Sequence, residues 1–190
     1  MLKVVILGLA LSAGNVLPTM MGSDIASAKP PEEPRSSEVS YIYGPGAANR
    51  QFKRLELSEK DFRCAAVAVY FEANNQSVYG QRAVYHVIAN RVLDPDFPSD
   101  VCSVVKQGRY WKGHPIREKC HFSYFCDGKS DNPRAKKEWK IAQAAVREAN
   151  RESDYTQGAT YYHADYVSPY WKEFYVRTTK IEKHIFYRKE

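Results

Sequence analysis

The chain has 190 residues, of which 44% are hydrophobic and 26% are charged, a composition typical of a globular domain that excludes a disordered or collagen-like chain. Its 28 basic and 22 acidic side chains leave a net charge of +6. Because this excess is spread along the sequence, it either favours an anionic partner or serves only solubility.

The first 28 residues have the pattern of a secretory signal peptide. A short positive start at Lys3 precedes an apolar run from Val4 to Leu11, and Ala26-Ser27-Ala28 forms an A-x-A cleavage site. The apolar run is too short to cross a bilayer well, although a retained anchor is the alternative interpretation. We therefore expect an exported protein, located in the periplasm or cell wall, that contacts the membrane only through this segment before cleavage.

The remaining chain divides into a linker and one compact domain. Residues 29–57 contain several prolines and no sustained apolar period, which predicts a linker. The compact domain is predicted at residues 58–190. Its first helix is predicted over 59–73. Ser58 is the expected N-cap, and the first turn of this helix is acidic.

The predicted first helix carries an acid on its inward stripe. Ala65, Ala68 and Val69 recur at helical spacing, and the next position in the series is Glu72. A carboxyl group in such a place loses hydration, which raises its pKa toward the value that a general acid needs. The alternative is that Glu72 lies in a fraying last turn and is simply solvated.

The elements that follow predict an α+β domain, rich in helices first and in strands last. We expect a second helix over 78–92, a short helix over 99–107 capped by Ser99, and a polar loop over 109–119. Residues 120–126 are expected as a short strand or extended loop, and a long helix is expected from Pro133 to Arg151. The period then changes, and the predicted strands are 159–163, 176–181 and 184–188.

Four cysteines in an exported chain favour two disulfides over a metal site, because no C-x-x-C pair is present. The three possible pairings of these cysteines stay open at this point. The residues concerned are Cys64, Cys102, Cys120 and Cys126.

Three groups of residues could carry chemistry: Glu72 with its aromatic flank, the segment around Ser123, and the aromatic segments near the C-terminus. The histidines form no H-x-x-x-H or H-E-x-x-H pattern, so we expect neither a metal nor a cofactor. Ser123, His163 and Asp127 together offer the residue types of a Ser-His-Asp catalytic triad. This set lacks the G-x-S-x-G context of a serine nucleophile.

Six segments, taken in order, resemble the cell wall hydrolase family of the spore-cortex lytic enzyme type. The resemblance runs from about Leu57 to Arg188. It rests on residues 64–73, 80–92, 97–98 with 101–105, 120–128, 158–163 and 184–188.

This resemblance implies a lysozyme-like α+β fold and cleavage of the glycan strands of peptidoglycan, with Glu72 at the position of the family's catalytic acid. Together with the three groups above, it suggests a substrate-binding surface. The residues expected there are Tyr70, Gln81, Phe122, Ser123, Asp127, Tyr162, His163 and Trp171. The expected partner is peptidoglycan, bound by a monomer, and not nucleic acid.

The chain departs from the family pattern at two places. Family members usually read Ala-Arg-Gly-Glu after the acid, whereas this chain has Ala73-Asn74-Asn75-Gln76, so any role of a second acid there is lost. Glu182 stands where a glycine is usual before the final strand.

One carboxylate without a clear second acid favours a lytic transglycosylase. Such an enzyme cleaves the β-1,4 bond between N-acetylmuramic acid and N-acetylglucosamine and leaves a 1,6-anhydro end. A hydrolytic muramidase, with Asp127 or a positioned water replacing the internal hydroxyl, is the nearest alternative. A metal-dependent amidase and an inactive wall-binding module remain as further alternatives.

Overall fold

The computed structural model describes residues 53–190, so the predicted signal segment and residues 29–52 of the predicted linker lie outside the described residues. Residues 53–57 form no helix or strand. Leu55 and Leu57 nevertheless pack against the core, and the Asn150 side chain bonds both the backbone N–H and the carbonyl of Leu55, at 3.1 and 2.9 Å. The end of the predicted linker is therefore attached to the domain.

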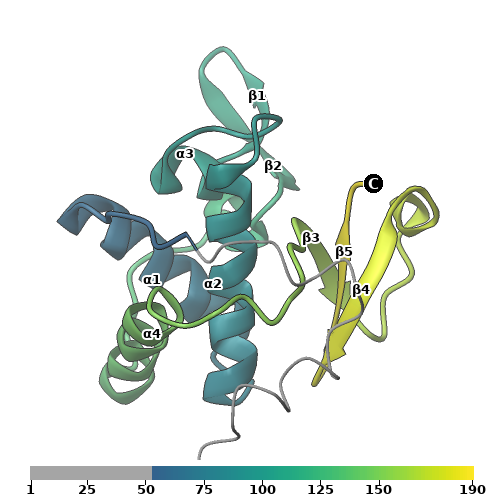
Figure 1. The fold of residues 1–190 in the computed structure, drawn as a ribbon. Helices are drawn as coiled ribbons and strands as arrows, with labels where there is room; N and C mark the ends of the chain where they lie inside the picture. Colours follow the sequence, from purple (N-terminus) through teal and green to yellow (C-terminus); the bar gives the residue numbers. More distant parts are fainter. Residues whose placement is uncertain (1–52) are drawn as a thin grey trace, which may run out of the picture. The chain divides into compact units, whose positions relative to one another are not determined.

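Helix α1 is the centre of a four-helix cluster (Figure 1). It packs against all three other α-helices of the described residues; the bounds are α1 Glu59–Ala73, α2 Val78–Leu93, α3 Val101–Val105 and α4 Lys136–Ala149. Because α1 has neighbours on several sides, residues 65–70 are buried continuously rather than at every third or fourth position. Its alanines allow the neighbouring backbones to approach closely.

Side-chain caps fix where the first three helices begin. The Ser58 hydroxyl accepts the Asp61 N–H at 3.1 Å, as predicted, and Ser77 accepts the Gly80 N–H in the same way. The third helix starts later than expected, because Asp100 rather than Ser99 is the cap and accepts the Ser103 N–H at 2.9 Å.

The expected loop over 109–119 is wrong, because the chain forms an antiparallel hairpin there. Strand β1 spans Gly108–Trp111 and β2 spans His114–Cys120. The turn between them is Lys112-Gly113, with φ of 48° and 80°. Two successive residues with positive φ are characteristic of the tight turn whose twist matches a β-hairpin.

The segment from Cys120 to Cys126 is also not a strand. Residues Ser123–Cys126 form a short 3₁₀ helix, η2, and Cys120 is bonded to Cys126. An extended segment of this length would separate its ends by about 20 Å. The disulfide instead holds the two Cα atoms 6.1 Å apart, so the chain must coil.

The second disulfide joins Cys64 on α1 to Cys102 on α3, and no free cysteine remains among residues 53–190. Two disulfides were expected, and the structure selects one of the three pairings. The long helix begins at Lys136 rather than at Pro133, because Ala135 is still extended and its N–H donates to the Tyr70 hydroxyl at 3.2 Å.

The C-terminal part is a three-stranded antiparallel sheet with the order β3-β5-β4 (Figure 1). Its strands are β3 Tyr161–Ala164, β4 Val176–Ile181 and β5 His184–Arg188, and a 3₁₀ helix, η3, spans Tyr170–Phe174 between β3 and β4. A small core joins this sheet to α2. It consists of Ala83, Val87, Ala159, Ile181 and Phe186. The observed elements match the expected α+β class.

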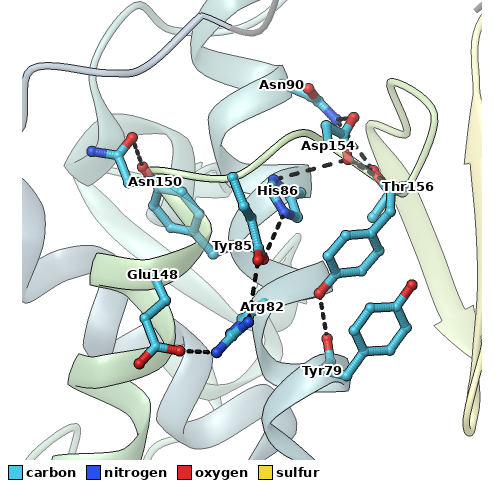
Figure 2. Close-up of polar contacts among 11 residues, drawn as sticks. Tyr79, Arg82, Tyr85, His86, Asn90, Glu148, Asn150, Asp154 and Thr156 are labelled. Atoms are coloured by element: carbon cyan, nitrogen blue, oxygen red, sulfur yellow. Dashed lines mark hydrogen bonds and ion pairs between the residues drawn. The ribbon is translucent and has the colours of Figure 1, made fainter. Parts of the chain in front are cut away.

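A polar network fixes the loop that leads from α4 into β3 (Figure 2). The Asn90 amide donates to Asp154 and to the Ala159 carbonyl, both at 2.9 Å, and Asp154 also accepts the Thr156 and Gly158 N–H groups. His86, buried on α2, lies against the same loop with its Nε2 3.5 Å from Glu152. The network therefore sets where β3 begins. Among residues 53–190, no helix is long and apolar enough to cross a membrane.

Candidate active site

Glu72 occupies the last turn of α1, where three elements meet. The Ser123 hydroxyl on η2 donates to Oε1 at 3.4 Å, and the Tyr162 hydroxyl on β3 donates to Oε2 at 3.3 Å. The backbone of Ser123 and Tyr124 adds further hydrogen bonds to the carboxylate. One carboxyl group thus touches both the helical part and the C-terminal sheet.

Burial raises the pKa of Glu72 above its ordinary value of 4.5. The hydrogen bonds from Tyr162 and from η2 act in the opposite direction, since they stabilise the ionised form. Burial also raises the pKa of Tyr162, and the neighbouring carboxylate adds to this shift, so the phenol stays a hydrogen-bond donor at neutral pH. The arrangement suits a carboxyl group that gives up and takes back a proton.

The residues beside Glu72 fix the end of α1 against its neighbours. The Phe71 ring stacks on the Tyr124 ring of η2, with the centroids 5.2 Å apart and the planes 13° apart. The Tyr70 hydroxyl holds the chain in front of α4. Glu72 therefore projects from a helix end that is packed on both sides.

Three of the predicted substrate contacts are buried instead. Tyr70, Gln81 and Phe122 are only 7%, 4% and 1% exposed. A polysaccharide cannot reach these side chains, so we interpret them as supports of the site, which corrects the expectation. For Phe122 the cause is the coil of the chain at the start of η2, which places Phe122 inward and Ser123 outward, whereas the predicted strand did not decide between the two faces.

Arg91, in the last turn of α2, is a residue of the site that the sequence analysis does not predict. It is 5% exposed, and its Nε donates to the Thr160 carbonyl at 2.7 Å. Its guanidinium carbon lies 5.2 Å from the Phe122 ring centroid and 5.6 Å from that of Tyr161. Burial lowers the pKa of Arg91, and the Glu72 carboxylate acts in the opposite direction. A buried cation thus lies beneath the site, and a buried Arg in the sequence gives no periodic signal that would identify it.

Asp127, the predicted second acid, is engaged in its own turn. Its Oδ1 accepts the Lys129 N–H at 2.7 Å, and its Oδ2 lies 3.7 Å from the Lys129 ammonium. Among residues 53–190, the hydrogen-bond partners of the Glu72 side chain include no carboxylate.

His163 and Trp171 belong to an aromatic cluster on the sheet rather than to the contacts of Glu72. The imidazole of His163 bonds the Ala164 carbonyl at 2.8 Å and the Tyr187 hydroxyl at 3.1 Å. Trp171 packs edge-on against His163 and Tyr187, at centroid distances of 5.6 Å. Both side chains are only partly buried, and His163 lies on the face of β3 opposite to Tyr162, because successive side chains of a strand alternate between its faces.

No group of three or more His, Cys, Asp or Glu side chains within residues 53–190 is arranged to hold a metal ion. His86, the most buried imidazole, contacts Glu152 and Asp154 and stacks edge-on against Tyr155. The geometry places it in the network of Figure 2.

Comparison with known proteins agrees with this architecture. The chain is 31% identical to the catalytic domain of the germination-specific lytic transglycosylase SleB from Bacillus anthracis, with a TM-score of 0.56, over 70% of this chain and 98% of that structure. The catalytic domain of the Bacillus cereus SleB protein matches at 29% identity and a TM-score of 0.57, over 74% of this chain and 99% of that structure. These matches confirm the lysozyme-like α+β fold.

Two curated relatives are named spore cortex-lytic enzymes. The one from Halalkalibacterium halodurans is 33% identical over 130 residues, which is 68% of this chain and 35% of that protein. The one from Bacillus cereus is 33% identical over 133 residues, which is 68% of this chain and 44% of that protein. The chain thus matches less than half the length of either relative. Residues 75–187, more than half of the chain, match the model of the Cell Wall Hydrolase family. The chain belongs to the cell wall hydrolase family of enzymes.

Proposed function

We propose that this protein cleaves the glycan strands of peptidoglycan as a lytic transglycosylase, with Glu72 as its single catalytic acid and base. The observation that carries the proposal is the partly buried Glu72 carboxyl group, held between the Ser123 and Tyr162 hydroxyls with its pKa raised by burial. Family membership and the resemblance to a lytic transglycosylase domain support the choice of substrate.

The first step is protonation of the leaving group. Glu72, in its protonated form, donates its proton to the glycosidic oxygen between N-acetylmuramic acid and N-acetylglucosamine as the bond from the anomeric carbon to that oxygen breaks. The N-acetylglucosamine leaves with a free hydroxyl. Glu72 is then a carboxylate, which the donors Ser123 and Tyr162 stabilise.

The second step closes a ring without water. The Glu72 carboxylate removes the proton from the C6 hydroxyl of the same muramic acid residue, and the C6 oxygen bonds to the anomeric carbon. The product is a 1,6-anhydro end, and Glu72 regains its proton. The acetamido group of this sugar is available to assist at the anomeric carbon.

Among the described residues, Glu72 is hydrogen-bonded to no second carboxylate, which favours this route over hydrolysis. A two-carboxylate glycosidase needs its acids about 5 to 10 Å apart, with the second one free to act as a nucleophile or to activate water. Asp127 is the candidate, and it is bonded to Lys129. A mechanism in which the substrate supplies its own hydroxyl needs no second carboxylate.

The surroundings of the site suit an anionic polysaccharide outside the cytoplasm. Trp171 and His163 offer partly buried rings on the C-terminal sheet on which pyranose sugars can stack, and Ser123 is exposed beside the acid. The net charge of +6 favours the carboxylates of the peptide stems. The two disulfides fit an oxidising compartment such as the periplasm or the cell wall. We propose that the enzyme acts there as a monomer.

The test is digestion of purified peptidoglycan sacculi followed by mass spectrometry of the soluble fragments. We expect fragments with 1,6-anhydro-muramic acid ends, and we expect Glu72→Gln to release none above background. Reducing ends would instead identify a muramidase, and free stem peptides would identify an amidase. Release of nothing by the unchanged protein would leave only a wall-binding role and would refute the proposal.

A further inference from the structure

The β1–β2 hairpin exposes an unusual amount of apolar surface. Trp111 is 69% exposed, Tyr110 46% and Ile116 39%. Single exposed apolar residues are common, but this small hairpin carries three of them: Trp111 and Ile116 on one face, and Tyr110 on the other face, toward Lys106. The hairpin is the element marked β1 and β2 in Figure 1, joined to the helical part near α3.

The same hairpin is cationic. Between Gly108 and Cys120 there is a single acid, Glu118, and the basic residues there are Arg109, Lys112, Arg117 and Lys119. The Lys112 ammonium lies 6.0 Å from the centre of the Trp111 ring. Aromatic rings flanked by cations match a polymer that presents both sugar rings and carboxylates.

A groove of about 530 Å³ lies at the foot of the hairpin. Its lining combines cations with hydroxyl groups and includes Lys60, Asp100, Ser103, Lys106, Tyr110 and His121. This volume is within the usual range of ligand sites, about 300 to 1,000 Å³.

The groove lies beside the segment that carries Ser123. His121 lines the groove and lies two residues before Ser123, whose hydroxyl contacts Glu72. The Lys106 ammonium lies 5.8 Å from the ring centre of Phe125, which is part of η2. A strand bound at Glu72 can therefore extend over η2 into the groove.

A hydrogen bond and a disulfide hold the hairpin in a fixed position on the rest of the domain. The Tyr110 hydroxyl donates to the Lys106 carbonyl at 2.7 Å, and Cys120 at the end of β2 is bonded to Cys126 at the end of η2. Surface that is already ordered binds with a smaller entropic cost.

We propose that the hairpin and this groove form a second contact for the same glycan strand, away from the bond that is cleaved. Trp111 stacks on a sugar ring, and Lys60 and Lys106 receive the carboxylates of a peptide stem. The proposal rests on the proposed function for the identity of the polymer, and it adds a residue-level basis for binding long, stem-bearing strands.

The test measures binding separately from cleavage. In a Glu72→Gln background, Trp111→Ala and Lys106→Gln should each weaken cosedimentation with sacculi about tenfold, the effect of losing a contact worth about 1.4 kcal/mol. The matched controls are Phe174→Ala, an aromatic residue that is 74% exposed on η3, and Lys140→Gln, an exposed cation on α4. Both controls should bind as the Glu72→Gln protein does. Circular dichroism checks that each variant is folded.

The chemistry of the occupant is tested with two further probes. Glycan strands stripped of their peptide stems should bind the Lys106→Gln protein and its parent equally. Vesicles of phosphatidylglycerol should not bind in a manner that depends on Trp111. Equal binding of Trp111→Ala and Phe174→Ala to sacculi would overturn the proposal, and so would binding to vesicles that requires Trp111, which would assign the hairpin to a membrane surface.

Failure of the two proposals can be told apart. With Glu72 intact, Trp111→Ala should lower kcat/KM on sacculi and leave the rate on a short muropeptide tetrasaccharide unchanged. If the unchanged protein bound sacculi through Trp111 but cleaved nothing, the hairpin contact would stand and the transglycosylase would fail. If cleavage occurred and Trp111 had no effect on kcat/KM, the hairpin contact would fail alone.

Discussion

The two disulfides should contribute to stability and to activity in opposite order. The Cys64–Cys102 bond joins residues separated by 38 positions, whereas the Cys120–Cys126 bond spans only 6. In the chain-entropy account, closing the longer loop stabilises the fold by about 4 kcal/mol and closing the shorter loop by about 2 kcal/mol. Replacing the first pair by alanine should therefore lower the free energy of unfolding more than replacing the second pair.

Activity should respond the other way. The short loop contains Ser123 and Tyr124, which bond the Glu72 carboxyl group through the Ser123 hydroxyl and both backbones. Without the Cys120–Cys126 bond, η2 is free to move away from Glu72. The Cys64–Cys102 bond joins α1 to α3, and Cys64 lies two helical turns before Glu72, so its loss leaves those contacts in place.

The measurement is urea unfolding of the two double-alanine proteins, paired with initial rates on sacculi at a temperature where both are folded. We expect the Cys120→Ala/Cys126→Ala protein to be the more stable and the less active of the two. The reasoning is refuted if that protein keeps full activity, or if it loses more stability than Cys64→Ala/Cys102→Ala.

Three substitutions, one at Glu72 and two at its hydrogen-bond donors, test the role of the acid. Glu72→Gln should lower turnover on sacculi at least about a hundredfold, the usual contribution of a general acid. Glu72→Gln should also raise the free energy of unfolding at neutral pH, because the pKa of Glu72 in the folded state lies above the ordinary 4.5. As the pH rises from 4.5 through the folded-state pKa, the buried carboxylate lowers the free energy of unfolding progressively, whereas an uncharged glutamine does not. A denaturation series from pH 4 to 8 would show no such divergence if Glu72 were solvated. Ser123→Ala removes one long hydrogen bond of 3.4 Å, so we expect a loss of about two- to tenfold in kcat with an unchanged melting temperature. Tyr162→Phe removes a bond that lowers the pKa of Glu72, so the alkaline limb of the pH–kcat profile should move to higher pH; a limb that stays in place would exclude this contact during catalysis.

The sequence predicted the parts of the fold that periodicity and caps determine. The first two helices and the last two strands lie within a residue or so of their expected bounds, because the Ser58 cap, the helical spacing of apolar residues and the strand pattern near the C-terminus are local signals. The hairpin was missed because Trp111-Lys112-Gly113-His114 is not one of the usual turn pairs, and the strands beside it are polar and exposed. The coil of η2 follows from a cysteine pairing that no local pattern specifies.

In the candidate site, too, some residues are indicated by local sequence signals and others are not. Glu72 stands out in the sequence because an acid on an apolar stripe is a local anomaly, and the sequence also indicates its neighbours Ser123 and Tyr162 as site residues. Whether Phe122 or Ser123 faces the acid depends on how η2 coils, and the inward place of Arg91 depends on rings from three separate segments. Such facts depend on tertiary packing, and a single sequence does not contain a signal for them.

Glu182 combines a backbone cost with a contact that explains why it is tolerated. It occupies the turn between β4 and β5 with φ of 49°, a left-handed conformation that favours glycine. Its Oε2 accepts the Ser77 N–H at 3.0 Å, and its Oε1 accepts the Ser77 hydroxyl. Ser77 is the cap of α2, where a negative charge is favourable, so the side chain offsets the backbone conformation by joining the turn to the start of that helix.

Two substitutions separate the cost from the contact. Glu182→Ala loses the contact and keeps the left-handed backbone, whereas Glu182→Gly loses the contact but removes the steric cost of about 1 kcal/mol. We expect the unfolding free energy of the glycine protein to exceed that of the alanine protein by about this amount, and we expect the alanine protein to be less stable than the unchanged one. Equal stability of the two variants in urea would mean that the turn relaxes without Glu182. An alanine protein as stable as the unchanged one would mean that the bonds to Ser77 contribute nothing to the attachment of the sheet to α2.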